Sequence, residues 1–314
     1  MPSLGPGRSG AGFRYGLKLL ASAGLLYLLF RVIPLSDILR IVATASAGIF
    51  AGGIALQFAN RGLSTLPLKV ITASQGIELS RRTLYRILLA VQFYSLLLPG
   101  ALAGGGATWL KYLEHGADKR AAAATVVINR AVALLVLVPV GTLGFVLDRR
   151  LPAHPPAVML GLIAACIACA FLLWYRWPYG NLRRIAAAGR WRRRLAALVD
   201  RLTALRRMPA RDKAMVAGGA IAAELGNVAA MWVFAQAVGV RVDFVSVMWM
   251  RGLLQMALLL PLSVAGLGVR EVSLVGLGAL VGVPATAAVA WSLTILAGSV
   301  GVALAGGLLE ATRT

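Results

Sequence analysis

The chain has 314 residues, of which 59% are hydrophobic and only 14% are charged. A soluble domain of this length carries roughly a quarter charged residues, so the composition excludes an ordinary soluble enzyme and indicates apolar surface that faces lipid. Lysine and arginine outnumber aspartate and glutamate by 32 to 11, a net charge of +21. Because these basic residues cluster between apolar segments, we interpret them as topology signals and contacts to anionic headgroups, and we expect no nucleic-acid binding.

The apolar segments predict an all-α, polytopic transmembrane bundle formed by a single integral-membrane domain over residues 1–314. A helix needs ~20 apolar residues to cross a bilayer. Segments that meet this need lie at about 15–33, 41–59, 121–147, 157–174, 214–238 and 285–308. The link over 34–40 is short, and the stretch 61–86 is basic and therefore predicted to be cytoplasmic.

The most basic stretch, residues 176–213, is predicted to be cytoplasmic as well. Its leucines recur at helical spacing among arginines, which favours an amphipathic helix on the inner leaflet over a solvated linker helix. Together with the basic residues before the first span, this places both termini in the cytoplasm of a bacterial inner-membrane protein.

One apolar run does not fit a simple crossing. Residues 87–103 are apolar, yet a full crossing there would place residues 176–213 outside the cell. The run ends in Pro99-Gly100 and is followed by Gly104-Gly105-Gly106, and these residue types permit a sharp reversal at membrane depth. The sequence therefore predicts a re-entrant helical hairpin near Pro99–Gly106.

The same pattern returns in the second half of the chain. Aligning Pro99 with Pro261, 162 residues later, also aligns Gly104 with Gly266 and Gly106 with Gly268. We predict a second broken segment over about 245–282 and two halves, about 15–147 and 157–309, of inverted orientation. Paired broken helices in inverted repeats are typical of transporters whose substrate site lies at mid-membrane depth.

Several ionisable residues, Arg251 among them, fall at or near membrane depth, where a charge is costly, and five of them are candidate site residues. These five are Lys111, Arg130, Glu224, Arg270 and Glu271. One hypothesis is a polar cavity in which the cations bind a phosphate headgroup while the two glutamates balance them or carry a proton. The alternative is a set of buried ion pairs between helices, for example Glu224 with an arginine.

Motifs of other chemistries are missing from the sequence. There is no phosphate-binding G-x-x-x-x-G-K-[ST] loop, no D-x-D pair and no G-x-S-x-G nucleophile motif. His115 and His154 have no metal-ligand partner at useful spacing. We therefore expect no cofactor, no metal site and no catalytic residues, and a lipid-modifying enzyme is the least favoured function.

The stretches Leu98-Pro99 to Gly104-Gly105, Arg130, and Pro261 to Gly266-Leu267-Gly268-Val269-Arg270-Glu271 carry a family resemblance. Over about residues 15–310, the chain resembles the flippase-like membrane domain of lysylphosphatidylglycerol synthases, including its stand-alone members. In the synthases a separate domain attaches lysine to the lipid. Since the chain ends at Thr314, the resemblance implies lipid transport or flipping without aminoacylation.

The resemblance implies a lipid substrate, either an anionic phospholipid or a polyprenyl- or hopanoid-type lipid. The leading hypothesis is a transporter that binds the headgroup at mid-membrane depth. The alternative is a non-transporting membrane partner or scaffold of a lipid or cell-envelope biosynthesis enzyme, recruited through residues 176–213.

Overall fold

A computed structural model describes residues 34–97, 103–151, 208–259 and 266–312, together with Tyr27 and Arg31. All regular secondary structure in these ranges is helical, as predicted. The helices are α2 (Leu35–Ala43), α3 (Ala47–Ser74), α4 (Arg81–Leu97), α5 (Ala103–Glu114), α6 (Lys119–Leu147), α11 (Ala210–Ala237), α12 (Phe244–Leu259), α13 (Val269–Ala279) and α14 (Ala285–Ala311). The predicted spans at 15–33 and 157–174, and nearly all of 176–213, lie outside the described residues.

Within the described residues, three helices are long and apolar enough to cross a membrane: α6, α11 and α14. A fourth span is possible if α2 and α3, which meet at 86°, count as one broken crossing. The predicted positions of α6, α11 and α14 agree with the structure to within a few residues. The chain is therefore an integral membrane protein.

The structure corrects the first described span. The link predicted over 34–40 lies mostly within α2, and α3 continues to Ser74 although the sequence places the end of the span near 59. The basic residues Arg61 and Lys69 suggested an aqueous loop. Arg61 instead lies within the helix and donates a hydrogen bond to Gln92 Oε1 at 2.8 Å, so an amide oxygen accepts a hydrogen bond where the sequence suggested water.

Two four-helix units follow one another along the chain, α3–α6 and α11–α14. Their first helices, α3 and α11, have 28 residues each. Both end at a glycine in the left-handed region, Gly76 (φ 76°) and Gly239 (φ 72°), which a residue with a Cβ adopts rarely. The first helices of the two units therefore match in length and in the glycine that follows them, and the inverted repeat stays a prediction.

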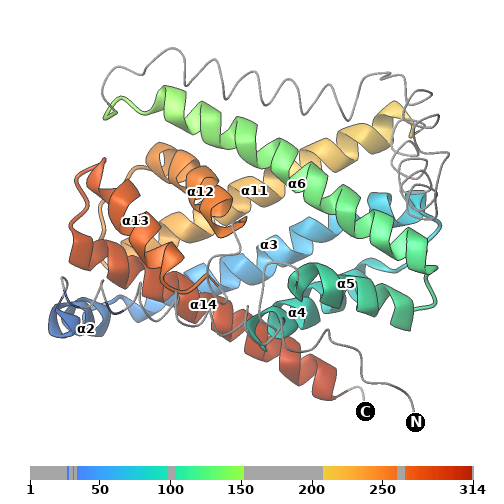
Figure 1. Ribbon diagram of the computed structural model, residues 1–314, viewed down its shortest axis with the longest axis horizontal. Coiled ribbons are helices and arrows are strands. Elements are labelled where there is room, and N and C mark those ends of the chain that lie inside the picture. Colours follow the sequence, from blue (N-terminus) through green and yellow to red (C-terminus); the bar gives the residue numbers. More distant parts are fainter. Residues whose placement is uncertain are drawn as a thin grey trace, which may run out of the picture.

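The two units contact each other through helices of one unit that pack on helices of the other. Helix α4 packs on α14 and α12 packs on α6, while α3 packs along α11 (Figure 1). The start of α3 meets the end of α11, where Ser46 N donates to Ala237 O at 2.8 Å. Further along α3, Pro67 lies against Gly219 near the start of α11. The two first helices are therefore antiparallel.

Glycines permit the close approach of helices from the two units. A Cβ at Gly144 in α6 would lie 2.5 Å from Met248 Cβ in α12, and one at Gly306 in α14 would overlap the carbonyl of Leu89 in α4. At both positions the space is too small for any residue larger than glycine. In each unit, a glycine in the last helix therefore allows close contact with the second helix of the other unit.

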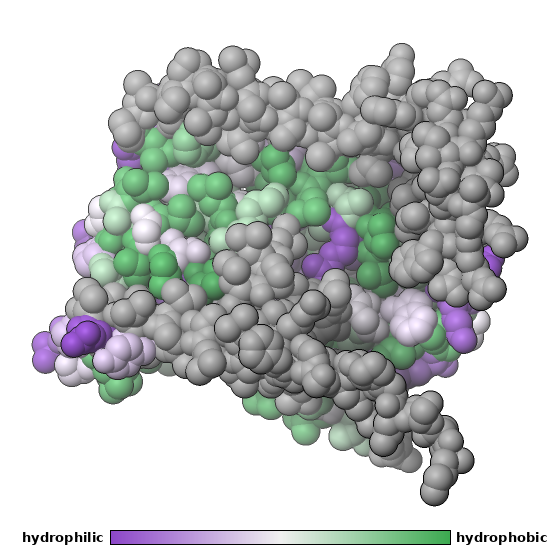
Figure 2. Space-filling model, in the orientation of Figure 1, coloured by the Kyte–Doolittle hydropathy of each residue, from purple (hydrophilic) through white to green (hydrophobic). Residues whose placement is uncertain are grey.

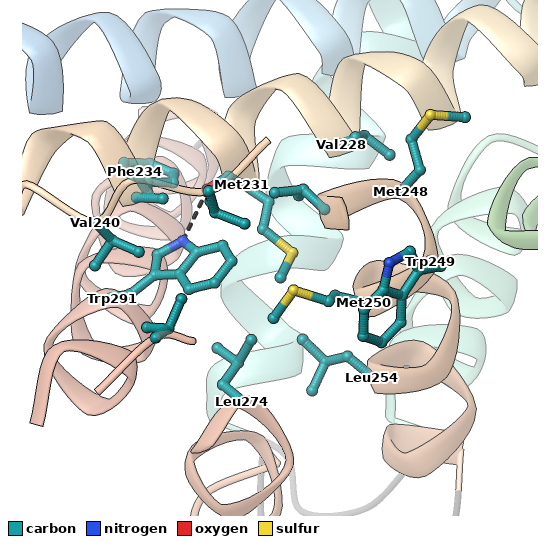
Figure 3. Close-up of a cluster of buried hydrophobic side chains, with 14 of the residues drawn as sticks. Val228, Met231, Phe234, Val240, Met248, Trp249, Met250, Leu254, Leu274 and Trp291 are labelled. Carbon is teal, nitrogen blue, oxygen red and sulfur yellow. Dashed lines mark hydrogen bonds between the residues drawn. The ribbon is translucent and has the colours of Figure 1, made fainter. Parts of the chain in front are cut away.

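The main hydrophobic core lies in the second unit and joins all four of its helices (Figure 3). Trp291 in α14 is fully buried, and its Nε1 donates to the Met231 carbonyl in α11 at 2.8 Å. Trp249 and Met250 in α12 and Leu274 in α13 complete the packing. This core holds α12 and α13 in a defined position on either side of the second predicted break.

Candidate functional site

The predicted breaks fall at the ends of described helices. Helix α12 ends at Leu259, and Gly266 (φ 79°) and Gly268 (φ 82°) form the turn that leads into α13. This turn agrees with the predicted second break, whose Pro261 lies outside the described residues. The positive φ angles explain why glycine occupies both positions.

Part of the first predicted break is helical. Helix α4 ends at Leu97 and α5 begins at Ala103, so Gly104, Gly105 and Gly106 lie inside α5 instead of forming the reversal. Pro99 and Gly100 lie outside the described residues. The sequence match between the two glycine clusters therefore does not extend to their backbone conformation.

An arginine guanidinium lies beside one glycine at each break. A Cβ at Gly104 would be 3.7 Å from Nη2 of Arg130, and a Cβ at Gly266 would be 3.7 Å from Nη2 of Arg270. Arg130 comes from α6 and Arg270 from α13. The tertiary fold thus brings two predicted site residues to the two breaks, although they occupy different positions in their units.

Arg130 lies near the middle of α6, a candidate membrane span, and its side chain is exposed. Its guanidinium makes no hydrogen bond or ion pair with any residue that the structure describes. In Figure 2, most of the coloured residues in the middle of the view are hydrophobic, and hydrophilic atoms are exposed among them. A charge in this setting calls for an anionic partner from outside the described chain.

Arg270 is partly buried, and its Nη1 is buried without a hydrogen-bond partner among the described residues. The adjacent Glu271 attracts it electrostatically, but both carboxylate oxygens of Glu271 already accept hydrogen bonds. One comes from Gly268 N at 2.7 Å and the other from Ser292 Oγ at 2.8 Å. Glu271 is 1% exposed and completes a capping box at the start of α13, so its observed contacts are structural.

Lys111 is buried and engaged by acidic residues. Its Nζ lies 2.8 Å from Glu114 Oε2, makes a second ion pair with Glu310 in α14, and sits 5.4 Å from the centre of the Tyr94 ring. These contacts fasten α5 to α14. Lys111 therefore joins α5 to α14 through an ion pair.

Glu224 follows the alternative in which charges pair between helices. Its Oε1 accepts a hydrogen bond from Arg251 Nε in α12 at 2.8 Å, and its Oε2 accepts one from Asn227 at 3.2 Å. Asn227 in turn accepts from Asn60 in α3 at 2.8 Å. The ion pair and the two amides form a polar layer where α3 and α11 cross.

Comparison with known protein families agrees with a membrane-spanning chain. A family profile, that of the lysylphosphatidylglycerol synthase TM region, matches residues 16–307, nearly the whole chain. The chain belongs to this family. No curated protein and no solved structure gives a significant match.

In this member of the lysylphosphatidylglycerol synthase TM family, sequence reasoning missed one charged element of the polar layer. Arg61 was assigned to a cytoplasmic stretch, but it donates to Gln92 in α4 and lies close enough to Arg251 for mutual repulsion. Of these two arginines, Arg251 is the one whose hydrogen bonds with Glu224 the structure shows. No local signal reveals this cluster, because its members come from α3, α4, α11 and α12.

Proposed function

We propose that this family member is a lipid transporter in which Arg130 and Arg270 bind the phosphate of a lipid headgroup at mid-membrane depth. The acyl or prenyl chains stay in the bilayer. The observation that carries the proposal is the pair of guanidinium groups beside the two helix breaks, neither of which has a hydrogen-bonded partner among the described residues.

The chemistry of arginine supports a phosphate ligand. A charged side chain at the centre of a membrane helix costs at least ~2.5 kcal/mol, and such residues pair with another group or line a water-filled path. Guanidinium groups bind phosphate oxygens through two parallel hydrogen bonds. An anionic phospholipid or a polyprenyl phosphate presents this group, so the proposal includes both.

The arrangement of the two units supports transport over static binding. In inverted-repeat transporters one unit rocks against the other around a central site. Here α3 and α11 are antiparallel, and α5 and α13 lie toward opposite ends of the molecule (Figure 1). We propose that α4 and α5 enter the membrane from the cytoplasm and α12 and α13 from outside, so that the broken helices meet near the middle.

Reconstitution in liposomes tests the proposal. The purified protein would be mixed with vesicles that contain fluorescent phosphatidylglycerol or a labelled polyprenyl phosphate, and the label exposed on each leaflet would be followed with time. We expect Arg130→Ala and Arg270→Ala each to slow transfer about tenfold or more, because a charge-assisted contact is worth ~1.5–3 kcal/mol. The matched control is Arg120→Ala, an exposed arginine one residue into the same helix as Arg130.

Two results would contradict the proposal in different ways. If the wild-type protein speeds the transfer of neither lipid, transport of these lipids is wrong and the role of a membrane partner for a lipid-biosynthesis enzyme gains support. If wild type is active but both variants equal Arg120→Ala, the protein transports and the assignment of Arg130 and Arg270 is wrong.

A further inference from the structure

A cavity lies away from the helix breaks, where the end of α3, the beginning of α4 and the beginning of α11 meet. Its volume is about 680 Å³, within the range of small-molecule sites. Its walls come mainly from aliphatic and thioether side chains, including Leu66, Val70, Met208 and Met215. None of these residues belongs to the proposed transport site.

Two cationic side chains line this cavity and have no hydrogen-bond or ion-pair partner among the described residues. Lys69 from α3 and Arg81 from α4 both line it, and both side chains are exposed. Neither the Lys69 ammonium nor the Arg81 guanidinium makes a hydrogen bond or ion pair within the described residues. Asp212 also lines the cavity, so the charge of these three side chains is +1.

The position of the cavity relates it to a membrane surface. Helix α11 is a candidate membrane span that begins at Ala210, and Pro209 and Asp212 at its start form part of the lining. An apolar pocket rimmed by two cations at the end of a span is complementary to an amphiphile with a negative headgroup. Basic pockets between transmembrane helices bind anionic lipid headgroups in this way.

We propose that this cavity is a binding site for an anionic phospholipid, separate from the transport path. The phosphate lies between Lys69 and Arg81, and the glycerol and the first carbons of the acyl chains lie against Leu66, Val70 and Met215. The lipid bridges α3, α4 and α11 and so joins the two units at one membrane surface. This site goes beyond the proposed function and does not require transport.

Native mass spectrometry of the detergent-purified protein tests the site. Phosphatidylglycerol and phosphatidylcholine would be titrated separately, and the bound molecules counted. We expect the double variant Lys69→Ala/Arg81→Ala to bind phosphatidylglycerol about tenfold more weakly, since two charged contacts to phosphate are removed. The matched control is Lys119→Ala/Arg120→Ala, which removes two exposed cations from the start of α6 and should leave binding unchanged.

The exchange Lys69→Arg/Arg81→Lys keeps both charges and should retain phosphatidylglycerol, which separates loss of charge from loss of fold. Phosphatidylglycerol binding in the alanine double variant equal to that of wild type would overturn the site, as would equally tight binding of phosphatidylcholine to wild type. Arg130→Ala/Arg270→Ala should keep this lipid bound. Absence of transport in the vesicle assay would therefore leave the site intact, and absence of this site would leave transport intact.

Discussion

Two acidic side chains, at comparable positions near the ends of α6 and α14, each fasten their helix to the other unit. Asp148, directly after α6, accepts hydrogen bonds from Ser246 Oγ at 2.6 Å and Trp249 Nε1 at 2.8 Å, both in α12. Glu310 in α14 pairs with Lys111 in α5. The last helix of each unit is therefore joined to the other unit by a polar contact near its C-terminal end.

Replacing Asp148 tests the importance of such a tie. Asp148→Ala leaves the Ser246 hydroxyl and the Trp249 N–H buried without their acceptor, and an unsatisfied buried group costs ~1–3 kcal/mol. We expect a loss of about 3 kcal/mol of stability, seen as a lower melting temperature in detergent. Asp243→Asn is the control, because Asp243 forms an exposed pair with Arg150 and such pairs contribute ~1 kcal/mol or less. Equal losses in both variants would contradict this account.

The same carboxyl predicts a pH dependence. Burial acts to raise the pKa of Asp148, but hydrogen bonds from Ser246, Trp249 and the Arg150 N–H, with the charge of Arg150, hold it below its ordinary value. A depressed folded pKa stabilises the protein above the unfolded pKa of ~3.9, and this stability is lost as pH falls through the folded pKa. The melting-temperature difference between wild type and Asp148→Ala should therefore stay constant from about pH 5 to 8 and shrink below about pH 4.

At the scale of helices, the pair Glu224–Arg251 joins α11 to α12 in the polar layer. Its side chains are 11% and 20% exposed, so removal of one partner leaves a largely buried charge. This placement makes Glu224 a packing residue first. The sequence hypothesis that it binds substrate or carries a proton stays a prediction, and it can be separated from packing by a double-mutant cycle.

We expect Glu224→Gln alone to lower stability by about 3 kcal/mol, because Arg251 loses its carboxylate. Adding Arg251→Gln should recover part of that loss, since neither charge is then unpaired. Melting temperature and lipid transfer would be measured for all variants, with Glu78→Gln, an exposed acid between α3 and α4, as the control. A stable double variant that transports like wild type supports a structural pair, whereas a stable but inactive one shows that Glu224 acts in transport.

For the whole molecule, the packing between the units α3–α6 and α11–α14 predicts opposite orientations of matching turns. The turn between α5 and α6 corresponds to the turn between α13 and α14. If the units are inverted across the membrane, these turns face opposite sides. Lys119 and Leu280, both exposed, mark the two turns.

Single-cysteine labelling tests this orientation in a chain whose Cys166 and Cys169 have been replaced by alanine. A membrane-impermeant maleimide added to intact cells should label Leu280→Cys and leave Lys119→Cys unlabelled until the membrane is opened. The unmodified cysteine-free chain is the control for background. Labelling of both positions from the same side would show that the units are not inverted.

Local patterns along the chain predict several features of the fold correctly. Composition indicates a membrane protein, and hydropathy locates α6, α11 and α14. The glycines at 266 and 268 predict the turn before α13, because left-handed backbone favours glycine wherever it occurs. The misassignment of Arg61 to a loop, and of Gly104–Gly106 to a break, shows the limit of such patterns: an isolated charge or glycine has the same local appearance inside a helix as outside it.

The sequence by itself determined the membrane class, the family and the glycine turn before α13, since each can be recognised from the chain without its tertiary contacts. Only the tertiary structure decided which charges are compensated. Lys111 meets Glu310 from 199 residues away, and Glu224 meets Arg251 from 27 away, while Arg130 and Arg270 meet no acid that accepts a hydrogen bond from them among the described residues. Whether a charged residue joins two helices or binds a ligand depends on which groups the packing of distant helices brings beside it. That packing is a property of the fold.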